Sequence, residues 1–372
     1  MKKSILYNVL LFLGLLFVEM SETFINVYFL QNRLAYIKIF GIIILTFIFL
    51  LTIFNMERKK IILIFLLIIF SLFIFFRFGN GIFLEMVVMI LAVQNKEFKR
   101  IVKMDLLVKL LIAVSLITFS KYGLTNGIFE TINRENVVRY SLGFYHPNTL
   151  GMYLMMISIE LLFVMKNKKK FINVLFMFIM SLIIYKVTYS RTCVYCLIGL
   201  ILIYIGSQYL EKKIMCANKK IYKFLSKNIY VFFLISTCLI SLLYHENSSI
   251  MIKLNELTNN RIFYQSYFIN NYGISIFDKN IDYIYTLDNG YLKIFLNYGL
   301  IGSILFIYVF RKNVEKTFKN KNLLLLGIYV VISLYCLSES YLFYSTYNIF
   351  LLYFFTKEEG EYNEIIDNNS DL

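Results

Sequence analysis

The sequence has 372 residues, of which 59% are hydrophobic and only 16% are charged, and its formal net charge at pH 7 is +15. Soluble proteins carry about 25% charged residues, and apolar runs such as residues 41–54 and 61–76 exceed what one soluble core can hold. The composition therefore excludes an ordinary soluble protein and predicts an all-α, polytopic integral membrane protein.

Twelve apolar segments are each expected to form a transmembrane helix, since about 20 mostly apolar residues cross ~30 Å of hydrocarbon. The first segment shows no A-x-A-like cleavage site, so we expect it to be retained rather than removed as a signal peptide. The predicted spans are residues 4–20, 36–54, 61–78, 81–94, 104–121, 148–165, 171–188, 192–210, 229–244, 294–310, 323–339 and 342–356.

Basic residues between these segments predict the orientation of the chain. In the twelve-span topology their clusters all fall on one side, which the positive-inside rule assigns to the cytoplasm. Both termini are then cytoplasmic in a multi-pass protein of the cell membrane. The basic runs are explained as topology signals, so no nucleic-acid partner is expected. The clusters lie at residues 2–3, 58–60, 96–103, 166–170, 212–227 and 311–321.

The predicted organisation is one transmembrane domain over residues 1–356, followed by an acidic, polar tail over 357–372 that we expect to be cytoplasmic and disordered. Most connections are short, but residues 245–293 form a long polar segment that is expected to be a large extracytoplasmic loop. A loop of this size indicates a site built over the bilayer surface. The segments 121–147 and 188–191 would also lie on that outer face.

Four arginines lie on or next to the expected outer face, where basic residues are scarce and are therefore candidates for function. The planar guanidinium fork binds phosphate through paired hydrogen bonds and keeps its charge. The alternative roles are snorkelling to lipid headgroups and, for the Arg134-Glu135 dipeptide, a local ion pair. The four are Arg134, Arg139, Arg191, which begins a span, and Arg261, which follows a Thr-Asn-Asn sequence.

Residues 143–151, with the sequence GFYHPNTLG, contain the only proline of the chain. Pro147 and Asn148 are typical of the start of a helix, whose positive dipole end would favour an anion. Glycines at both ends of this sequence allow close backbone approach. His146 and Asn148 are candidate substrate-binding residues, and the alternative is a tight turn without a ligand.

A second polar sequence, Asp288-Asn289-Gly290-Tyr291, lies where the large loop would return to the membrane. Asp-Asn-Gly is common in plain turns, but a carboxylate at this edge can also take a proton from a sugar hydroxyl. Asn289 and Tyr291 are the neighbouring candidates for substrate contact. Glu339, in the last outer turn, either serves structure or lines a polar cavity.

No metal or redox motif is predicted. Asp278-x-Asn280-x-Asp282 resembles the start of a calcium loop but lacks the glycine and the glutamate that an EF-hand needs at its sixth and twelfth positions. Cys193-x-x-Cys196 falls in an apolar segment without a second pair, so packing explains it better than zinc or redox chemistry. No cofactor is expected.

These motifs occur in one order: GFYHPNTLG, YSRT at a helix start, NNR in the long loop, and DNGYLKIFLNYGLIG at the return to the membrane. In this the chain resembles the Wzy-type polysaccharide polymerases and the related O-antigen ligases, from about residue 134 to 341. The resemblance implies a GT-C-like membrane fold. Asp288 stands where the ligases typically have histidine, which favours a polymerase. The ligases tend to have the pattern Arg-x-x-x-Leu, and here Tyr195 stands at the leucine position after Arg191. Some polymerases have the pattern R-x10-G, and here Gly273 lies one residue too far from Arg261.

The resemblance implies a glycosyltransferase that takes glycan from an undecaprenyl-pyrophosphate donor on the outer face, without a nucleotide sugar or a metal. Arg191 and Arg261 would hold the pyrophosphate, and Asp288 would orient or deprotonate the acceptor hydroxyl. Capsule, exopolysaccharide or O-antigen would be the product, and a chain-length regulator and a flippase would be partners. Two alternatives stay open: a transporter or flippase of lipid-linked oligosaccharide, and an O-antigen or wall-polymer ligase.

Overall fold

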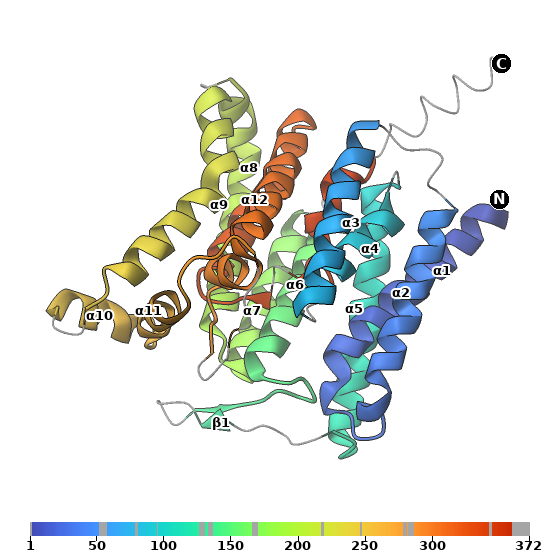
Figure 1. Cartoon of the computed structure of the whole chain (residues 1–372), viewed down its shortest axis with the longest axis horizontal. Helices are drawn as coiled ribbons and strands as arrows, with labels where there is room; N and C mark the ends of the chain where they lie inside the picture. The colour runs from blue at the N-terminus through green and yellow to red at the C-terminus, as the bar shows by residue number, and fades with distance from the viewer. Residues whose placement is uncertain are drawn as a thin grey trace. The chain divides into compact units, whose positions relative to one another are not determined.

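The structure is a computed structural model that describes residues 2–51, 58–78, 81–94, 96–125, 131–132, 137–165, 170–216, 219–245, 248–277, 281, 286–341 and 344–358. Over these residues the fold is helical apart from one hairpin of two short antiparallel strands (Figure 1). This confirms the all-α class that the composition predicts.

The α-helices are α1 Lys2–Thr23, α2 Leu34–Leu50, α3 Arg58–Phe78, α4 Ile82–Val93, α5 Phe98–Lys121, α6 Pro147–Met165, α7 Lys170–Thr188, α8 Arg191–Cys216, α9 Lys219–Leu242, α10 Ser249–Leu257, α11 Arg261–Tyr272, α12 Gly290–Lys319 and α13 Leu323–Tyr335. Short 3₁₀ helices are η1 Phe24–Asn26, η2 Gln31–Arg33 and η5 Ile349–Phe355, and the hairpin pairs β1 Thr131–Ile132 with β2 Val138–Arg139.

Within the described residues, five helical segments are long and apolar enough to cross a membrane: Ile5–Asn26, Gln31–Leu50, Pro147–Met165, Lys170–Thr188 and Gly290–Lys319. Five more are apolar but shorter: Ile61–Arg77, Ile82–Val93, Arg191–Ser207, Ser226–Leu242 and Leu323–Tyr335. Many of their large apolar side chains are exposed, as lipid-facing residues would be. Length and composition therefore indicate a membrane protein.

The expected twelfth span, residues 342–356, has a different structure. Within its described part, the 3₁₀ helix η5 covers only Ile349–Phe355. These seven residues extend about 14 Å at ~2.0 Å per residue, well short of ~30 Å of hydrocarbon. Six of the seven are buried, and rings from this helix pack against Phe98 and Phe163. The apolar sequence of this segment is explained by burial inside the protein.

The chain divides into two compact units by its internal contacts, and the prediction of one transmembrane domain over residues 1–356 stays a prediction. The first unit contains residues 1–66, 84–201 and 344–372, and the second contains residues 67–83 and 202–343. Both units contain apolar helices that could cross a membrane in whole or in part. Helices α3 and α8 each contribute residues to both units.

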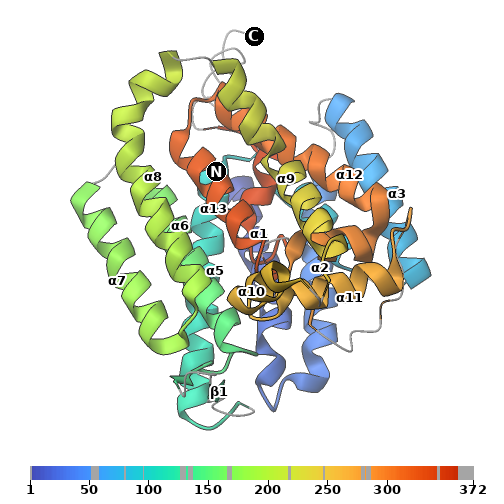
Figure 2. The same ribbon diagram turned by 90° about the vertical axis from the view of Figure 1, so that its left-hand side faces the viewer.

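In the first unit α1 and α2 run alongside each other, and α5 packs on α1 and on α6 (Figure 1). Small residues let the first pair approach closely. A Cβ at Gly14 would lie 2.6 Å from Leu45 Cδ2, and one at Gly41 would lie 2.8 Å from Val18 Cγ2. Glycine at helix contacts is typical of packing between membrane helices. Figure 2 shows α6 beside α7 in the same unit.

In the second unit α9 and α12 lie side by side (Figures 1 and 2), and the buried Tyr230 of α9 occupies the centre of their contact. Its ring lies 4.8 Å from that of Tyr291, 5.3 Å from that of Phe306 and 5.7 Å from that of Phe310. This aromatic layer fixes α12, whose first residues adjoin the candidate site.

The segment expected to be a large extracytoplasmic loop, residues 245–293, contains two short helices, α10 and α11. Ser248 caps α10 by accepting a hydrogen bond from Met251 N at 3.5 Å. The polar composition of this segment hid the helices, since helices this short carry too few residues to show a clear period.

Helix α12 is interrupted at Gly299, which adopts φ +65° and ψ −168°. The chain that follows α11 fills the break, because Leu300 N donates to Ser275 O at 2.9 Å and Ile301 N to Ile276 O at 3.2 Å. A Cβ at Gly299 would lie 2.6 Å from the carbonyl oxygens of residues 276 and 277. Only glycine fits this backbone and this contact.

We expect Gly299→Ala to lower the free energy of unfolding by more than the 1–2 kcal/mol that a left-handed L-residue costs, because the added methyl group also meets backbone oxygen. Denaturant unfolding of the detergent-purified protein, followed by circular dichroism, measures this loss. The control is Gly199→Ala in α8, where nothing lies within 4 Å of the new Cβ and alanine should instead stabilise by about 0.5–1 kcal/mol. Equal effects of the two substitutions would contradict the packing assigned to Gly299.

Candidate functional site

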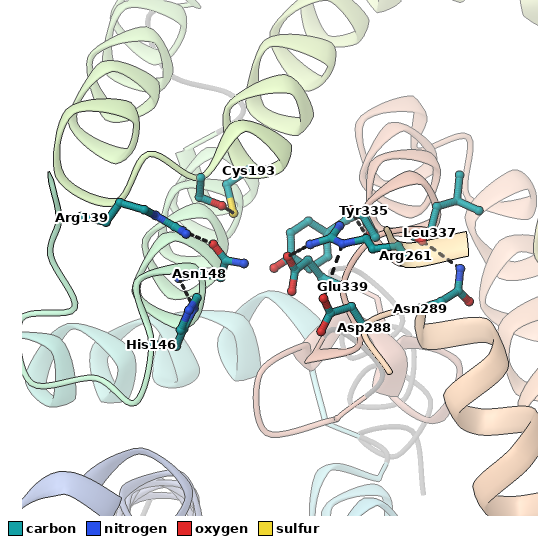
Figure 3. Close-up of polar contacts among 12 residues, drawn as sticks. Arg139, His146, Asn148, Cys193, Arg261, Asp288, Asn289, Tyr335, Leu337 and Glu339 are labelled. Atoms are coloured by element: carbon teal, nitrogen blue, oxygen red, sulfur yellow. Dashed lines mark hydrogen bonds and ion pairs between the residues drawn. The ribbon is translucent and has the colours of Figure 1, made fainter. Parts of the chain in front are cut away.

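Three residues selected from the sequence meet in the second unit, although up to 78 positions separate them (Figure 3). Arg261 Nη2 donates to Glu339 Oε1 at 2.9 Å, and Arg261 Nε lies 3.4 Å from Asp288 Oδ2. The side chain of Glu339 is 4% exposed, that of Arg261 20% and that of Asp288 37%. The cluster therefore has a buried carboxylate behind the arginine and a second carboxylate that solvent reaches.

Arg261 is the first residue of α11, and the turn between α10 and α11 sets its position. Asn255 Oδ1 accepts from Phe263 N at 2.9 Å, and Asn255 Nδ2 donates to Asn260 Oδ1 at 3.2 Å. Asn259 and Asn260 have φ values of +55° and +63°. Asparagine adopts this left-handed conformation more readily than other non-glycine residues. The Thr-Asn-Asn sequence thus reverses the chain immediately before the arginine.

Asp288 is positioned by its neighbour Asn289, the N-cap of α12. Asn289 Oδ1 accepts from Leu292 N at 3.0 Å, and its Nδ2 donates to Leu337 O at 2.8 Å. Gly290 N donates to Cys336 O at 2.9 Å. These bonds tie the start of α12 to the turn that follows α13, and this turn carries Glu339.

We expect Asn289→Ala to cost more stability than an ordinary cap, because it removes the cap of α12 and the bond to Leu337 together. The matched control is Asn322→Ala, which removes the corresponding asparagine cap of α13 at Leu325. The control should lose about 1 kcal/mol and Asn289→Ala about 1 kcal/mol more. Denaturant titration of both purified variants measures the difference, and equal losses would show that the bond to Leu337 adds nothing.

Lys293 and Ser340, which the sequence analysis did not select, also belong to this group. Lys293 Nζ donates to Ser340 Oγ at 3.2 Å, and the ammonium is close enough to Asp288 and Glu339 to interact with both carboxylates. Two cations thus face two carboxylates. The available signal was proximity in sequence, because Lys293 lies five residues after Asp288 and directly before the predicted span 294–310.

Tyr291 is placed differently from its predicted role in substrate contact. It is fully buried, its hydroxyl donates to Ser333 O at 2.7 Å, and its ring packs on Tyr230 and Phe233. The ring presents no face to a ligand in this structure. Tyr291 therefore fixes α12, and we leave it out of the proposed site.

A second group of predicted residues gathers in the first unit, around the start of α6 (Figure 3). Arg139 Nε donates to Thr188 O at 2.7 Å, and its Nη2 donates to Asn148 Oδ1. Asn148 N donates in turn to His146 Nδ1 at 3.1 Å. These hydrogen bonds connect the start of α6 to the end of α7. In this structure Arg139, His146 and Asn148 therefore hold the two helix ends together.

The predicted start of a helix at Pro147 is confirmed, since α6 begins there. The predicted close approach of the flanking glycines is confirmed as well. A Cβ at Gly143, which has φ +89°, would lie 2.7 Å from Leu116 O. One at Gly151 would lie 2.9 Å from Ser190 Cβ and 3.0 Å from Thr188 Oγ1. Both glycines are thus required by packing around the start of α6.

Arg191 begins α8, as predicted, and its exposed guanidinium lies over the ring of Tyr189 at 5.1 Å from the ring centroid. Ser190 and Cys193, next to it, are buried. Ser190 Oγ donates to Cys193 Sγ at 3.2 Å, which agrees with a packing role for the cysteine. Arg134 and residues 278, 280 and 282 of the calcium-like sequence lie outside the described residues, as does the tail over 359–372.

Helical architecture and apolar spans indicate a membrane protein, in which Arg261 contacts one buried and one solvent-accessible carboxylate. Comparison of the sequence with protein-family models and with curated proteins, and of the fold with solved structures, gave no match. The function is therefore inferred from the residues themselves.

Proposed function

We propose that this protein polymerises lipid-linked oligosaccharide repeat units, transferring glycan from an undecaprenyl-pyrophosphate donor to a sugar hydroxyl of a second lipid-linked unit. The observation that carries the proposal is the contact of Arg261 with both Asp288 and Glu339. The sequence motifs assign pyrophosphate binding to Arg261 and contact with the acceptor hydroxyl to Asp288, and Glu339 is the buried partner of the arginine. We also propose that the transfer takes place on the outer face of the membrane. The product would be a capsule, an exopolysaccharide or an O-antigen.

The three side chains suit different steps of such a transfer. A guanidinium has five N–H donors, so its contacts with two carboxylates leave donors for the oxygens of a pyrophosphate. Positive charge at this point would offset the negative charge that develops on the leaving group. Glu339 is nearly inaccessible and holds Arg261 in place.

Asp288 is more accessible than Glu339, at 37% against 4%. An acceptor hydroxyl can therefore approach the Asp288 carboxylate, which would orient it or take its proton as the new glycosidic bond forms. The role of Arg191 as a ligand of the donor stays a prediction from the sequence, and its side chain is exposed at the start of α8 in the first unit.

The test is a gel of surface glycan from cells carrying the wild type, a deletion, or Asp288→Asn. We expect a long ladder in the wild type that collapses to single repeat units in the other two. The matched control is Glu256→Gln in α10, an equally conservative change at an exposed carboxylate, which should leave the ladder intact. Immunoblots of membrane fractions check that each variant is present at wild-type level.

An unchanged ladder in the deletion strain would refute the polymerase proposal. If the ladder is lost in the deletion strain but kept in Asp288→Asn, the polymerase function stands and Asp288 takes no part in it. Full-length polymer that accumulates on the lipid carrier in the deletion strain would instead identify a ligase, which differs from a polymerase in its acceptor.

A transporter or flippase of lipid-linked oligosaccharide is the second candidate function. It is favoured by the break of α12 at Gly299, because discontinuous helices often form the binding sites of transporters. Cysteine-accessibility mapping separates the two proposals. A continuous water path along α12 on both sides of Gly299 would favour transport, and labelling confined to one side of the membrane would favour the transferase.

A further inference from the structure

Four charged side chains that the proposed function does not use are buried together in the first unit. Glu19 comes from α1, Asp105 and Lys109 come from α5, and Glu160 comes from α6. Each side chain is at most 2% exposed. Lys109 lies near the middle of α5, because this helix begins at Phe98 and thus six residues before the predicted span.

Lys109 contacts all three carboxylates but cannot neutralise them. Its Nζ donates a hydrogen bond to Asp105, lies 3.0 Å from Glu160 Oε1 and lies 3.8 Å from Glu19 Oε1. One ammonium against three ionised carboxylates leaves two uncompensated negative charges in a region without solvent. Such charges are strongly disfavoured, and a carboxyl group in this position takes up a proton instead.

The hydrogen bonds indicate which carboxyl groups take the protons. Asp105 accepts from Lys109, whereas none of the four carboxyl oxygens of Glu19 and Glu160 has a donor at hydrogen-bonding geometry. A buried carboxylate needs donors, but a protonated carboxyl group is itself a donor and is much less costly to bury. Asp105 is therefore the ionised partner of Lys109.

An independent observation comes from Tyr153 of α6. This tyrosine is fully buried, its hydroxyl faces Glu19, and the hydroxyl makes no hydrogen bond at accepted geometry in the structure. Asp105 and Tyr347 are the other titratable groups that face it. The hydroxyl can donate to one oxygen of Glu19 or accept from a proton on it, so it is a suitable second partner for a carboxylic acid.

We propose that Glu19, Asp105, Lys109, Glu160 and Tyr153 form a proton-binding site inside the first unit, in which Glu19 and Glu160 each hold a proton. The protons come from water when the site assembles, and the Lys109–Asp105 pair stays ionised. Among the described residues, no group of three or more metal-ligating side chains is placed to hold a metal ion. Because α1, α5 and α6 each contribute, the site links proton binding to the packing of these three helices.

Infrared spectroscopy of the purified protein in lipid at neutral pH tests the proposal. Protonated carboxyl groups absorb in a C=O band separate from the bands of carboxylates. We expect this band in the wild type and a loss of most of its intensity in the Glu19→Gln/Glu160→Gln variant, since glutamine has the shape of a protonated glutamate. The control is Glu256→Gln, which changes an exposed carboxylate of α10 and should leave the band unchanged.

Absence of the band in the wild type, or a band of full intensity in the double variant, would overturn the proposal. The fold of the double variant is itself a readout, because amides that replace protonated acids should leave the circular dichroism spectrum and the melting temperature at wild-type values. Failure of this variant and of both single glutamine variants to fold would also count against the proposal, since it would mean that the ionised forms are required.

Discussion

Replacement of Arg261 by alanine is expected to eliminate the long glycan ladder while the protein remains in the membrane. Loss of a preorganised donor to a developing anion typically lowers the rate by about 10²–10³-fold, or about 2.7–4 kcal/mol of transition-state stabilisation. Arg261→Lys should retain part of the activity, because lysine keeps the charge but lacks the planar fork. Ladder length and the rate of polymer synthesis in isolated membranes measure both effects.

The same substitution removes the partner of Glu339, so a loss of stability must be distinguished from a loss of catalysis. Glu339 is 4% exposed and would be left as a buried, unpaired carboxylate. The Arg261→Gln/Glu339→Gln variant removes both charges and should recover stability without recovering the ladder. A restored ladder in this double variant would show that Arg261 serves only to neutralise Glu339 and would remove it from the proposed mechanism.

Lys253→Ala is the matched control for Arg261→Ala. Lys253 is a basic residue of α10 in the same segment, and its side chain is exposed. Lys253 makes no contact with Asp288 or Glu339 in the structure, so its loss should leave the ladder unchanged. The free energy of unfolding should change by no more than about 0.5 kcal/mol. An equal loss of polymer in both variants would indicate a general effect of positive charge in this segment and would reject a specific role for Arg261.

The local features of the fold were largely predictable from sequence. Apolar runs marked the helices, Pro147 marked the start of α6, and Gly143 and Gly151 marked close contacts. Each of these signals acts within one turn or one helix, where sequence spacing fixes geometry. The segment 342–356 shows the limit of this reasoning, because an apolar run has the same composition whether lipid or protein surrounds it.

The candidate site was predictable residue by residue but not as an arrangement. Arg261 was selected because basic residues are scarce on the expected outer face, Asp288 as a carboxylate at the membrane edge, and Glu339 as a polar residue of the last outer turn. Nothing in the sequence shows that one guanidinium contacts both carboxylates. The turn that aims Arg261 depends on the side chain of Asn255 and on two asparagines with positive φ. Such tertiary hydrogen bonds leave no periodic signal.

The buried charges of the first unit were hidden for the same reason. Lys109 and Glu160 were visible as charges in apolar segments, but their depth depends on where α5 begins, and their partner Glu19 lies ninety positions before Lys109. Asp105 and Lys109 carried the one local signal, an acidic and a basic residue four positions apart in a predicted helix. Such a pair is common on exposed helices, so its burial became evident only from the packing of α1, α5 and α6.

Lys109→Met is expected to give the largest loss of stability of any single substitution proposed for this chain. Lys109 is fully buried and is the cation that contacts Asp105, Glu160 and Glu19. Removal of one partner from a buried ion pair typically costs about 3–5 kcal/mol, because the remaining charge has neither solvent nor a counterion. Denaturant titration of the detergent-purified protein, followed by circular dichroism, measures this loss.

The Lys109→Met/Asp105→Asn variant should recover most of that stability, because a buried ion pair can often be replaced by uncharged residues at little cost. Lys38→Met provides the matched control. Lys38 also lies between two carboxylates, at 2.5 Å from both Glu22 and Glu85, but its own side chain is 30% exposed and that of Glu22 is 28% exposed. Solvent screens that group, so its loss should cost less. If the double variant does not recover stability, Lys109 must stabilise Glu19 and Glu160 as carboxylates, which contradicts the proton-binding site. Recovery of stability is expected if both glutamates are already neutral.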